Sequence, residues 1–156
     1  MAQLKDILVY LLDKYPIKDE LTNARVTRTV YLADWTMAIR YKKQISNIIW
    51  HFDNYGPFVD DVEKEIIKYS DLFNRTDTVN MYGKYKNIFT LQDTNYKPKL
   101  SDEEIECLQH VIDITKKMFW ADFIKLVYST FPILTSERYT NLDLVSKAKE
   151  YEVYKF

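Results

Sequence analysis

Glycine and proline are scarce in this sequence of 156 residues, which contains two glycines and four prolines. Tight turns and phosphate-binding loops depend on these residues. Their scarcity therefore argues against many tight turns and against a glycine-cradled phosphate site. Helices are the favoured elements.

Cysteine is almost absent. Cys107 stands alone, so an internal disulfide is excluded and a secreted, disulfide-stapled scaffold is not indicated. No stretch approaches the ~20 apolar residues of a membrane span. The apolar run Ile7–Leu12 lies between Asp6 and Asp13 and follows no basic leader, so it is interpreted as a helix rather than a targeting segment. We expect a cytoplasmic protein without membrane association.

Neither charge is in excess, because 22 Lys and Arg oppose 23 Asp and Glu for a formal net charge of -1. A near-neutral chain lacks the positive field on which non-specific nucleic-acid binding depends, although a local basic patch is left open. The pairs Lys42-Lys43 and Lys116-Lys117 stand at predicted helix ends, where cations complement the helix dipole. Contact with nucleic-acid phosphates is their alternative role.

The length and the 47% hydrophobic content suit one compact core, and no repeat or linker divides the chain. We expect residues 1–156 to form a single domain. The predicted fold is mostly α: a compact single-domain helical bundle with a small β-hairpin or short β-sheet.

The first half of the chain carries two clear helical patterns. Apolar spacing predicts a helix over Ala2–Lys14, which ends before Pro16, and a long core helix over Asn23–Lys42, capped by Thr22 or Asn23. The β-branched and aromatic run Ile45–Phe52 predicts a short strand that leads into the turn Asn54–Pro57.

A third helix is predicted from Pro57, in its first turn, to about Asn74. The segment Arg75–Pro98 is the most irregular part of the sequence. Within it, the run Tyr85–Leu91 is typical of a strand and is expected to pair with the earlier strand.

The clearest helix boundary is a capping box formed by Ser101 and Glu104, which predicts a helix to about Lys117. A shorter helix over Ala121–Thr130 is expected to end at Pro132. The tail, Asn141–Tyr151, is predicted as a last, partly exposed helix.

The two histidines, His51 and His110, lack a neighbouring Cys, Glu or His at ligand spacing, so surface or half-buried structural roles are favoured. A hydrolase that uses either histidine with a carboxylate or an ion in a cleft is the alternative. Glu106 beside Cys107 disfavours a reactive thiolate. The pairs Asp60-Asp61 and Glu103-Glu104 fit first-turn helix positions rather than a metal site. We predict no catalytic residue, no metal site, no cofactor and no enzyme activity.

Aromatic residues are frequent, at 15%, and gather in two places. Most of them are expected to be core residues, but exposed Tyr and Trp are also typical of protein interfaces. The turn around Tyr55 is either a binding surface or a packed corner. The candidate partner-binding residues are Trp50, Tyr55, Gly56, Pro57 and Phe58. Phe52 belongs to the same group, and the second group consists of Phe119, Trp120, Phe123, Tyr128 and Phe131.

The order of three short motifs resembles the Panacea domain, the SocA-like antitoxin family. These motifs are TVYLAD at Thr29–Asp34, YGP at Tyr55–Pro57 and LSDEE at Leu100–Glu104, and ADFIKLVYSTFPI follows them as in the family. The resemblance covers roughly Leu4–Pro132.

Three places differ from the family's usual pattern. Arg28-Thr29 replaces Lys-Leu, Asp53-Asn54 lengthens the interval before YGP, and Tyr128 stands where a histidine is often found.

The resemblance implies a bacterial or phage antitoxin-like protein whose partner is a small toxin encoded nearby. Relatives neutralise the toxin by direct contact, and some deliver it to a protease as adaptors. The family brings no catalytic residues. The alternative functions are a DNA-binding autoregulator and a phage-related protein with another interaction role.

Overall fold

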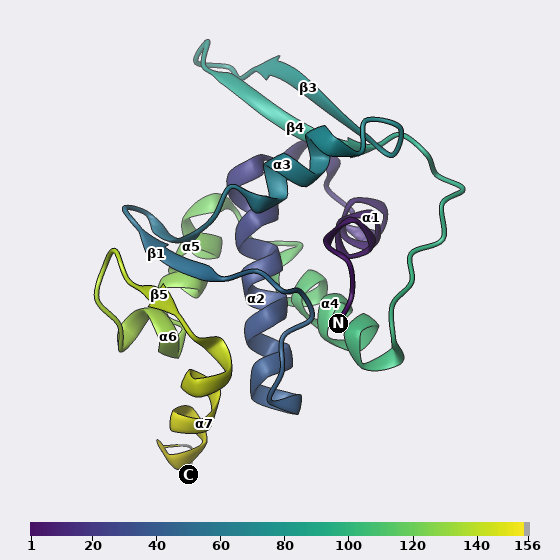
Figure 1. Cartoon of the computed structure of the whole chain (residues 1–156). Helices are drawn as coiled ribbons and strands as arrows, with labels where there is room; N and C mark the ends of the chain where they lie inside the picture. The colour runs from purple at the N-terminus through teal and green to yellow at the C-terminus, as the bar shows by residue number, and fades with distance from the viewer. Residues whose placement is uncertain (155–156) are drawn as a thin grey trace.

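The structure is a computed structural model that describes residues 1–154 (Figure 1). Helical residues make up 51% of the chain and strand residues 16%, so the fold is mostly α with small sheets, as the sequence predicted. Within the described residues the elements are α1 (Leu4–Lys14), the 3-10 helix η1 (Lys18–Glu20), α2 (Asn23–Tyr41), β1 (Trp50–Asp53), β2 (Gly56–Phe58), α3 (Asp61–Lys68), β3 (Phe73–Val79), β4 (Tyr85–Leu91), α4 (Asp102–Thr115), α5 (Trp120–Tyr128), α6 (Phe131–Leu134), β5 (Asn141–Leu142) and α7 (Leu144–Tyr154).

Helix α2 runs through the centre of the molecule, and α4, α7, α3 and β2 pack on it (Figure 1). Its side chains are buried over most of its length. The Thr22 hydroxyl accepts the backbone N–H of Arg25 at 3.2 Å and caps the helix, and Lys42 ends it in the left-handed conformation with φ 58°. The predicted helix over residues 23–42 is confirmed.

The predicted first helix and the capped helix are also confirmed. In helix α1 every residue from Asp6 to Leu12 is buried, because α3, α4 and β4 pack around it. In α4, the Ser101 hydroxyl accepts the N–H of Glu104, and the Glu104 carboxylate accepts the N–H of Ser101. Both halves of the predicted capping box are therefore present.

Two small antiparallel sheets complete the fold. The first has the order β2-β1-β5, with Asp53 opposite Gly56 and Trp50 opposite Leu142. The second is the β3–β4 hairpin, which lies at the top of Figure 1. The hairpin pairs residue for residue over seven positions. The β content is thus larger than the single hairpin or sheet expected from the sequence.

The strand predicted over Ile45–Phe52 is correct only from Trp50 onward. Residues 45–49 are irregular because their polar groups are satisfied by side chains instead of a sheet partner. Asp34 accepts the N–H groups of Ile45 and Ser46 at 2.9 and 3.0 Å, and Gln44 donates to the carbonyl oxygen of Ile48 at 2.9 Å.

The prediction for residues 57–98 is wrong in four respects. Helix α3 begins at Asp61, not at Pro57, which lies in β2. It ends at Lys68 and not near Asn74, and Phe73–Val79 form strand β3, which was not predicted from the sequence. Strand β4 has the predicted bounds, but its partner is β3 and not β1. Because all residues of β3 beyond Phe73 are exposed, β3 carries no alternation of apolar and polar residues that would have indicated a strand.

The carboxy-terminal predictions need smaller corrections. Pro132 does not close the helix before it, since α5 ends at Tyr128 and Pro132 lies in the first turn of α6. The tail helix begins at Leu144, because Asn141 and Leu142 pair with β1 as strand β5. It continues to Tyr154 and buries only Leu144 and Ala148, so the expected partial exposure is confirmed.

Candidate functional site

The turn between β1 and β2 presents Tyr55 to solvent with 76% of its surface exposed. The next residue, Gly56, is buried and has φ +95°, a conformation that side chains rarely adopt. A Cβ atom there would lie 3.4 Å from Cζ of Tyr128 on α5. The backbone conformation therefore favours glycine at this position, and a larger side chain would press against Tyr128.

A buried arginine on α2, Arg28, supports the β1–β2 turn through a hydrogen bond to its backbone. Arg28 is 5% exposed, and its Nη2 donates to the carbonyl oxygen of Tyr55 at 2.9 Å. Nη1 donates to the carbonyl oxygen of Ala24 at 3.1 Å, and the guanidinium lies 5.1 Å from the centre of the Phe58 ring. Burial lowers the pKa of Arg28, and the charges of Tyr128 and Asp53 oppose that shift. No carboxylate of residues 1–154 forms an ion pair with Arg28.

Trp50 is fully buried and therefore lies beneath the candidate surface rather than on it. Its Nε1 donates to Oδ2 of Asp34 at 2.9 Å, and its ring meets Tyr31 edge to face at 5.4 Å. Burial raises the pKa of Asp34 to about 6, against the opposing effect of its hydrogen bonds from Ser46, Trp50 and Ile45. Trp50 thus ties β1 to the central helix.

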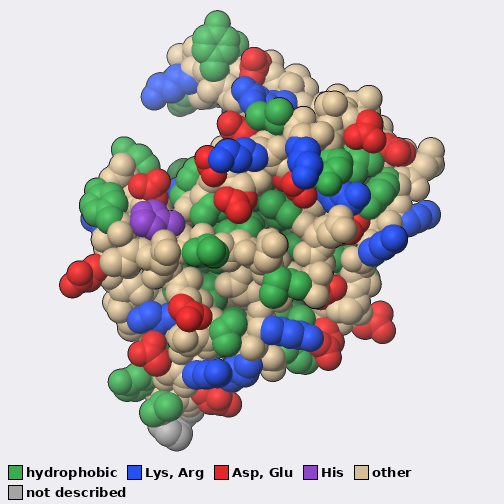
Figure 2. Space-filling view, in the orientation of Figure 1, with side chains coloured by type: hydrophobic (Ala, Val, Ile, Leu, Met, Phe, Trp, Pro, Cys, Tyr) green, Lys and Arg blue, Asp and Glu red, His purple; other side chains and the backbone are tan. Residues whose placement is uncertain are grey.

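The loop between α6 and β5 extends the surface beside the turn. The Tyr139 hydroxyl donates to Oδ1 of Asn54 at 2.5 Å, and Tyr139 is itself 63% exposed. The Arg138 guanidinium lies 5.7 Å from the centre of the Phe52 ring. In Figure 2, hydrophobic side chains stand out at the left of the molecule, at the level of this turn.

Of the residues predicted as candidates, four lie together in the turn and in β2: Tyr55, Gly56, Pro57 and Phe58. Pro57 is buried and Phe58 half-buried, so Tyr55 alone is an exposed contact residue. Arg28 and Tyr128 position the turn, a role that the sequence did not predict for them. Both are departures from the family pattern, and the structure places both against the same turn.

The remaining candidates stay apart. His51 is half-buried with Nδ1 3.1 Å from Oδ1 of Asn141, and His110 is exposed on α4. Burial raises the pKa of the Cys107 thiol, whose Sγ lies 3.6 Å from Sδ of Met37. Over the part of the chain that the structure describes, no group of three His, Cys, Asp or Glu could hold a metal ion. None of the described helices has both the length and the apolar character needed to cross a membrane.

The charged residues lie at the helix ends that were predicted for them from the helix dipole. Asp60 and Asp61 stand at the start of α3, Glu103 and Glu104 in the first turn of α4, and Lys42 and Lys116 at the carboxy-terminal caps of α2 and α4. The lysines Lys42, Lys43 and Lys116 also lie 3.5 to 3.6 Å from carboxylates of Glu152, Glu103 and Asp113.

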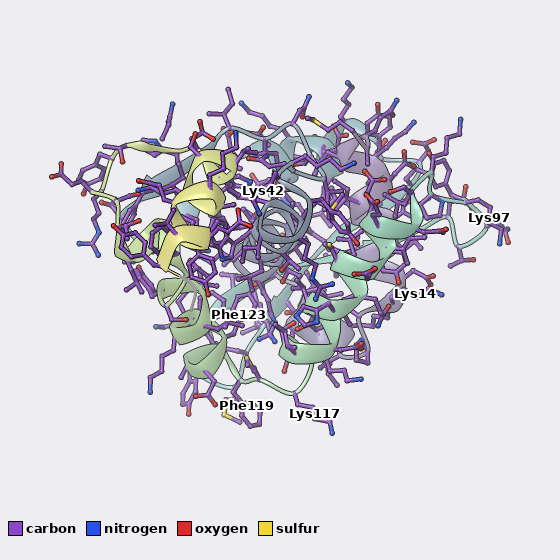
Figure 3. The ribbon with its side chains drawn as sticks, turned by 90° about the horizontal axis from the view of Figure 1, so that it is seen from below. Lys14, Lys42, Lys97, Lys117, Phe119 and Phe123 are labelled. Atoms are coloured by element: carbon purple, nitrogen blue, oxygen red, sulfur yellow. The ribbon has the colours of Figure 1, made fainter. Side chains whose placement is uncertain are left out.

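The members of the second aromatic group near the start of α5 differ in exposure. Phe123 is fully buried, whereas Phe119 is 79% exposed and Trp120 46% exposed. Figure 3 shows Phe123 directed into the molecule and Phe119 at its edge, near Lys117.

The fold and the turn define the class: a small, mostly helical domain built on one central helix, with an exposed aromatic turn held by buried polar side chains. The chain belongs to the antitoxin SocA-like, Panacea domain family, whose profile matches residues 26–131. The match confirms the resemblance of the motifs, and it runs from the first turn of α2 through the β1–β2 turn, α3, the β3–β4 hairpin and α4 to the end of α5. The family indicates an antitoxin-type role and is not a known class of enzyme. No curated protein and no solved structure matches the chain.

Proposed function

We propose that this chain is an antitoxin-like protein-binding module that neutralises a cognate toxin by direct contact, with the β1–β2 turn at the centre of the contact. The observation that carries the proposal is the 76% exposure of Tyr55 on a supported turn. Gly56, the next residue, lies close to Tyr128 of α5, and the Tyr55 carbonyl oxygen accepts a hydrogen bond from Arg28 of α2. We further propose that the chain is one domain, acts in the cytoplasm, and has a partner encoded nearby.

A tyrosine on a fixed turn is suited to protein recognition. Its ring offers a large contact area at a small cost in conformational entropy, and its hydroxyl offers a hydrogen bond. The hydrogen bond from Arg28 to the Tyr55 carbonyl oxygen further restricts the backbone before binding. A restricted turn loses less freedom on association than a flexible loop does, which favours affinity.

Two mechanisms of neutralisation are compatible with such a contact. In the first, the domain covers the toxin's active surface. In the second, it delivers the toxin to a protease. They differ in the fate of the toxin, since occlusion leaves the toxin level unchanged while delivery lowers it in a protease-dependent manner.

The test is co-expression of this chain with the product of the adjacent gene, followed by growth and co-purification assays. Tyr55→Ala is expected to weaken binding by roughly 30-fold, the effect of losing an interface hot spot, and to restore toxicity. The matched control is Tyr154→Ala on α7, where the tyrosine is similarly exposed at 74%. A neighbour that is neither toxic nor co-purified, or equal effects of the two substitutions, would refute the proposal.

A further inference from the structure

Strand β3 has an unpaired outer edge. The sheet contains only β3 and β4 among the described residues. The other edge of β4 is partly covered, because Phe89 donates its backbone N–H to the carbonyl oxygen of Leu21 at 2.9 Å and Ile88 bridges Thr22. Between residues 74 and 79, by contrast, the described chain makes no backbone hydrogen bond except those to β4. In Figure 1, β3 lies on the outer side of the hairpin.

The edge carries charged side chains, which are one of the features that usually prevent a strand from pairing with another chain, but it lacks others. Those others include proline, lysine and a β-bulge. β3 contains neither proline nor lysine, and its register with β4 has no bulge. Its two charges, Arg75 and Asp77, have opposite signs and lie two residues apart, so they share one face of the strand. Neither forms an ion pair within residues 1–154.

The sequence of β3 is complementary to itself in one antiparallel register. When two copies are centred on Thr76, each Arg75 lies opposite the Asp77 of the other copy, which gives two ion pairs by symmetry. Asn74 then faces Thr78, and Phe73 faces Val79. A parallel pairing in the same register would place Arg75 beside Arg75 and Asp77 beside Asp77, which is unfavourable.

We infer that two copies of this chain associate through antiparallel pairing of their β3 strands, which creates a continuous four-stranded sheet with the order β4-β3-β3-β4. The interface has two-fold symmetry, so the same patch serves both copies. The backbone groups of both free edges are satisfied, and the cross-strand pairs of opposite charge fix the register. This inference is independent of the proposed function, because it requires no toxin and does not involve the β1–β2 turn.

The test is sedimentation of the purified chain over protein concentrations from about 1 μM to 1 mM, the range expected for a small interface. The wild-type chain is expected to dimerise. Arg75→Asp and Asp77→Arg each place like charges opposite each other at two positions, and each should raise the dissociation constant by roughly tenfold or more. Both positions are exposed, so the fold should survive, which circular dichroism verifies.

Two combinations make the test specific to the register. An equimolar mixture of Arg75→Asp and Asp77→Arg is expected to form a mixed dimer, because every facing pair again has opposite charges. The double variant Arg75→Asp/Asp77→Arg is expected to dimerise like the wild type. The matched control is Lys86→Asp, which makes the same change of charge on β4, one strand away from the interface, and should leave the dissociation constant unchanged.

A wild-type chain that stays monomeric up to the highest concentration would overturn the inference. The β3 edge would then be available for pairing with a strand of a different protein. Dimers that resist both single substitutions, or a mixture of the two variants that does not associate, would overturn it as well.

Discussion

Among the buried ionisable side chains of α2, Arg28 and Asp34 hold the backbone on the two sides of β1. Arg28 donates to the carbonyl oxygen of Tyr55, and Asp34 accepts backbone N–H groups of Ile45 and Ser46. Desolvation of such groups is costly, and hydrogen bonds offset the cost only in the folded arrangement. The central helix therefore determines the path of the chain on both sides of β1.

Asp34 should make stability depend on pH in a defined window. Its pKa is raised from the ordinary value of 3.8 to about 6, so the native state holds the proton more tightly than the unfolded state does. The stabilising contribution is complete below pH 3.8 and is lost as the pH rises through 6. Relative to Asp34→Asn, which cannot titrate, the wild type should lose roughly 2–3 kcal/mol across this window, measured by urea unfolding from pH 4 to 8. Parallel pH profiles for the two proteins would contradict this assignment.

Gly56 should tolerate substitution less well than the other glycine. Gly56→Ala places a Cβ 3.4 Å from Tyr128 at φ +95° and should cost about 1–3 kcal/mol in free energy of unfolding. Gly83 in the β3–β4 turn also has a positive φ, but a Cβ there would meet nothing within 4 Å. Gly83→Ala should therefore cost less, about 1 kcal/mol. Equal losses for the two variants in thermal or urea unfolding would show that the contact with Tyr128 is unimportant.

At the scale of the element, local signals were sufficient where the stabilising groups are close in sequence. The Ser101–Glu104 capping box and the apolar spacing of α2 predicted their helices correctly. The strand prediction for residues 45–49 was wrong because their stabilising partner, Asp34, lies eleven or more residues away and no local sequence pattern indicates it. Strand β3 was not predicted because it is stabilised by pairing with β4 and has no buried face that would leave an apolar pattern in the sequence. The turn at Tyr55 was predicted, but its supports, Arg28 and Tyr128, depend on tertiary contacts.

The capping box should make a measurable contribution to α4. Ser101→Ala removes the acceptor for the N–H of Glu104 and should lower the free energy of unfolding by about 1 kcal/mol. Asp60 occupies the corresponding position of α3, but its side chain makes no capping hydrogen bond. Asp60→Ala is the control and should cost less than Ser101→Ala in the same urea titration. The reverse order would show that the cap contributes less than the exposed ion pair of Asp60 with Lys64.

On the scale of the whole molecule, Arg25 joins segments that lie far apart in the chain. Its Nη2 donates to the Tyr15 hydroxyl at 2.8 Å, to the carbonyl oxygen of Thr115 at 2.9 Å and to that of Met118 at 3.0 Å. The guanidinium also lies 4.4 Å from the centre of the Phe123 ring. A side chain that is 2% exposed thus connects the end of α1, the start of α2, the end of α4 and the interior face of α5.

Arg25→Lys should therefore destabilise the fold although it keeps the charge. A lysine has one nitrogen and cannot reproduce the planar guanidinium that donates through Nε and Nη2 and stacks on Phe123. The loss of these hydrogen bonds at a buried site should cost about 2–4 kcal/mol in urea unfolding. The matched control is Arg40→Lys, where the ion pair with Glu106 at 2.8 Å is largely exposed and the change should cost less than about 1 kcal/mol. Similar losses at the two sites would mean that α1, α4 and α5 hold their positions through apolar packing alone.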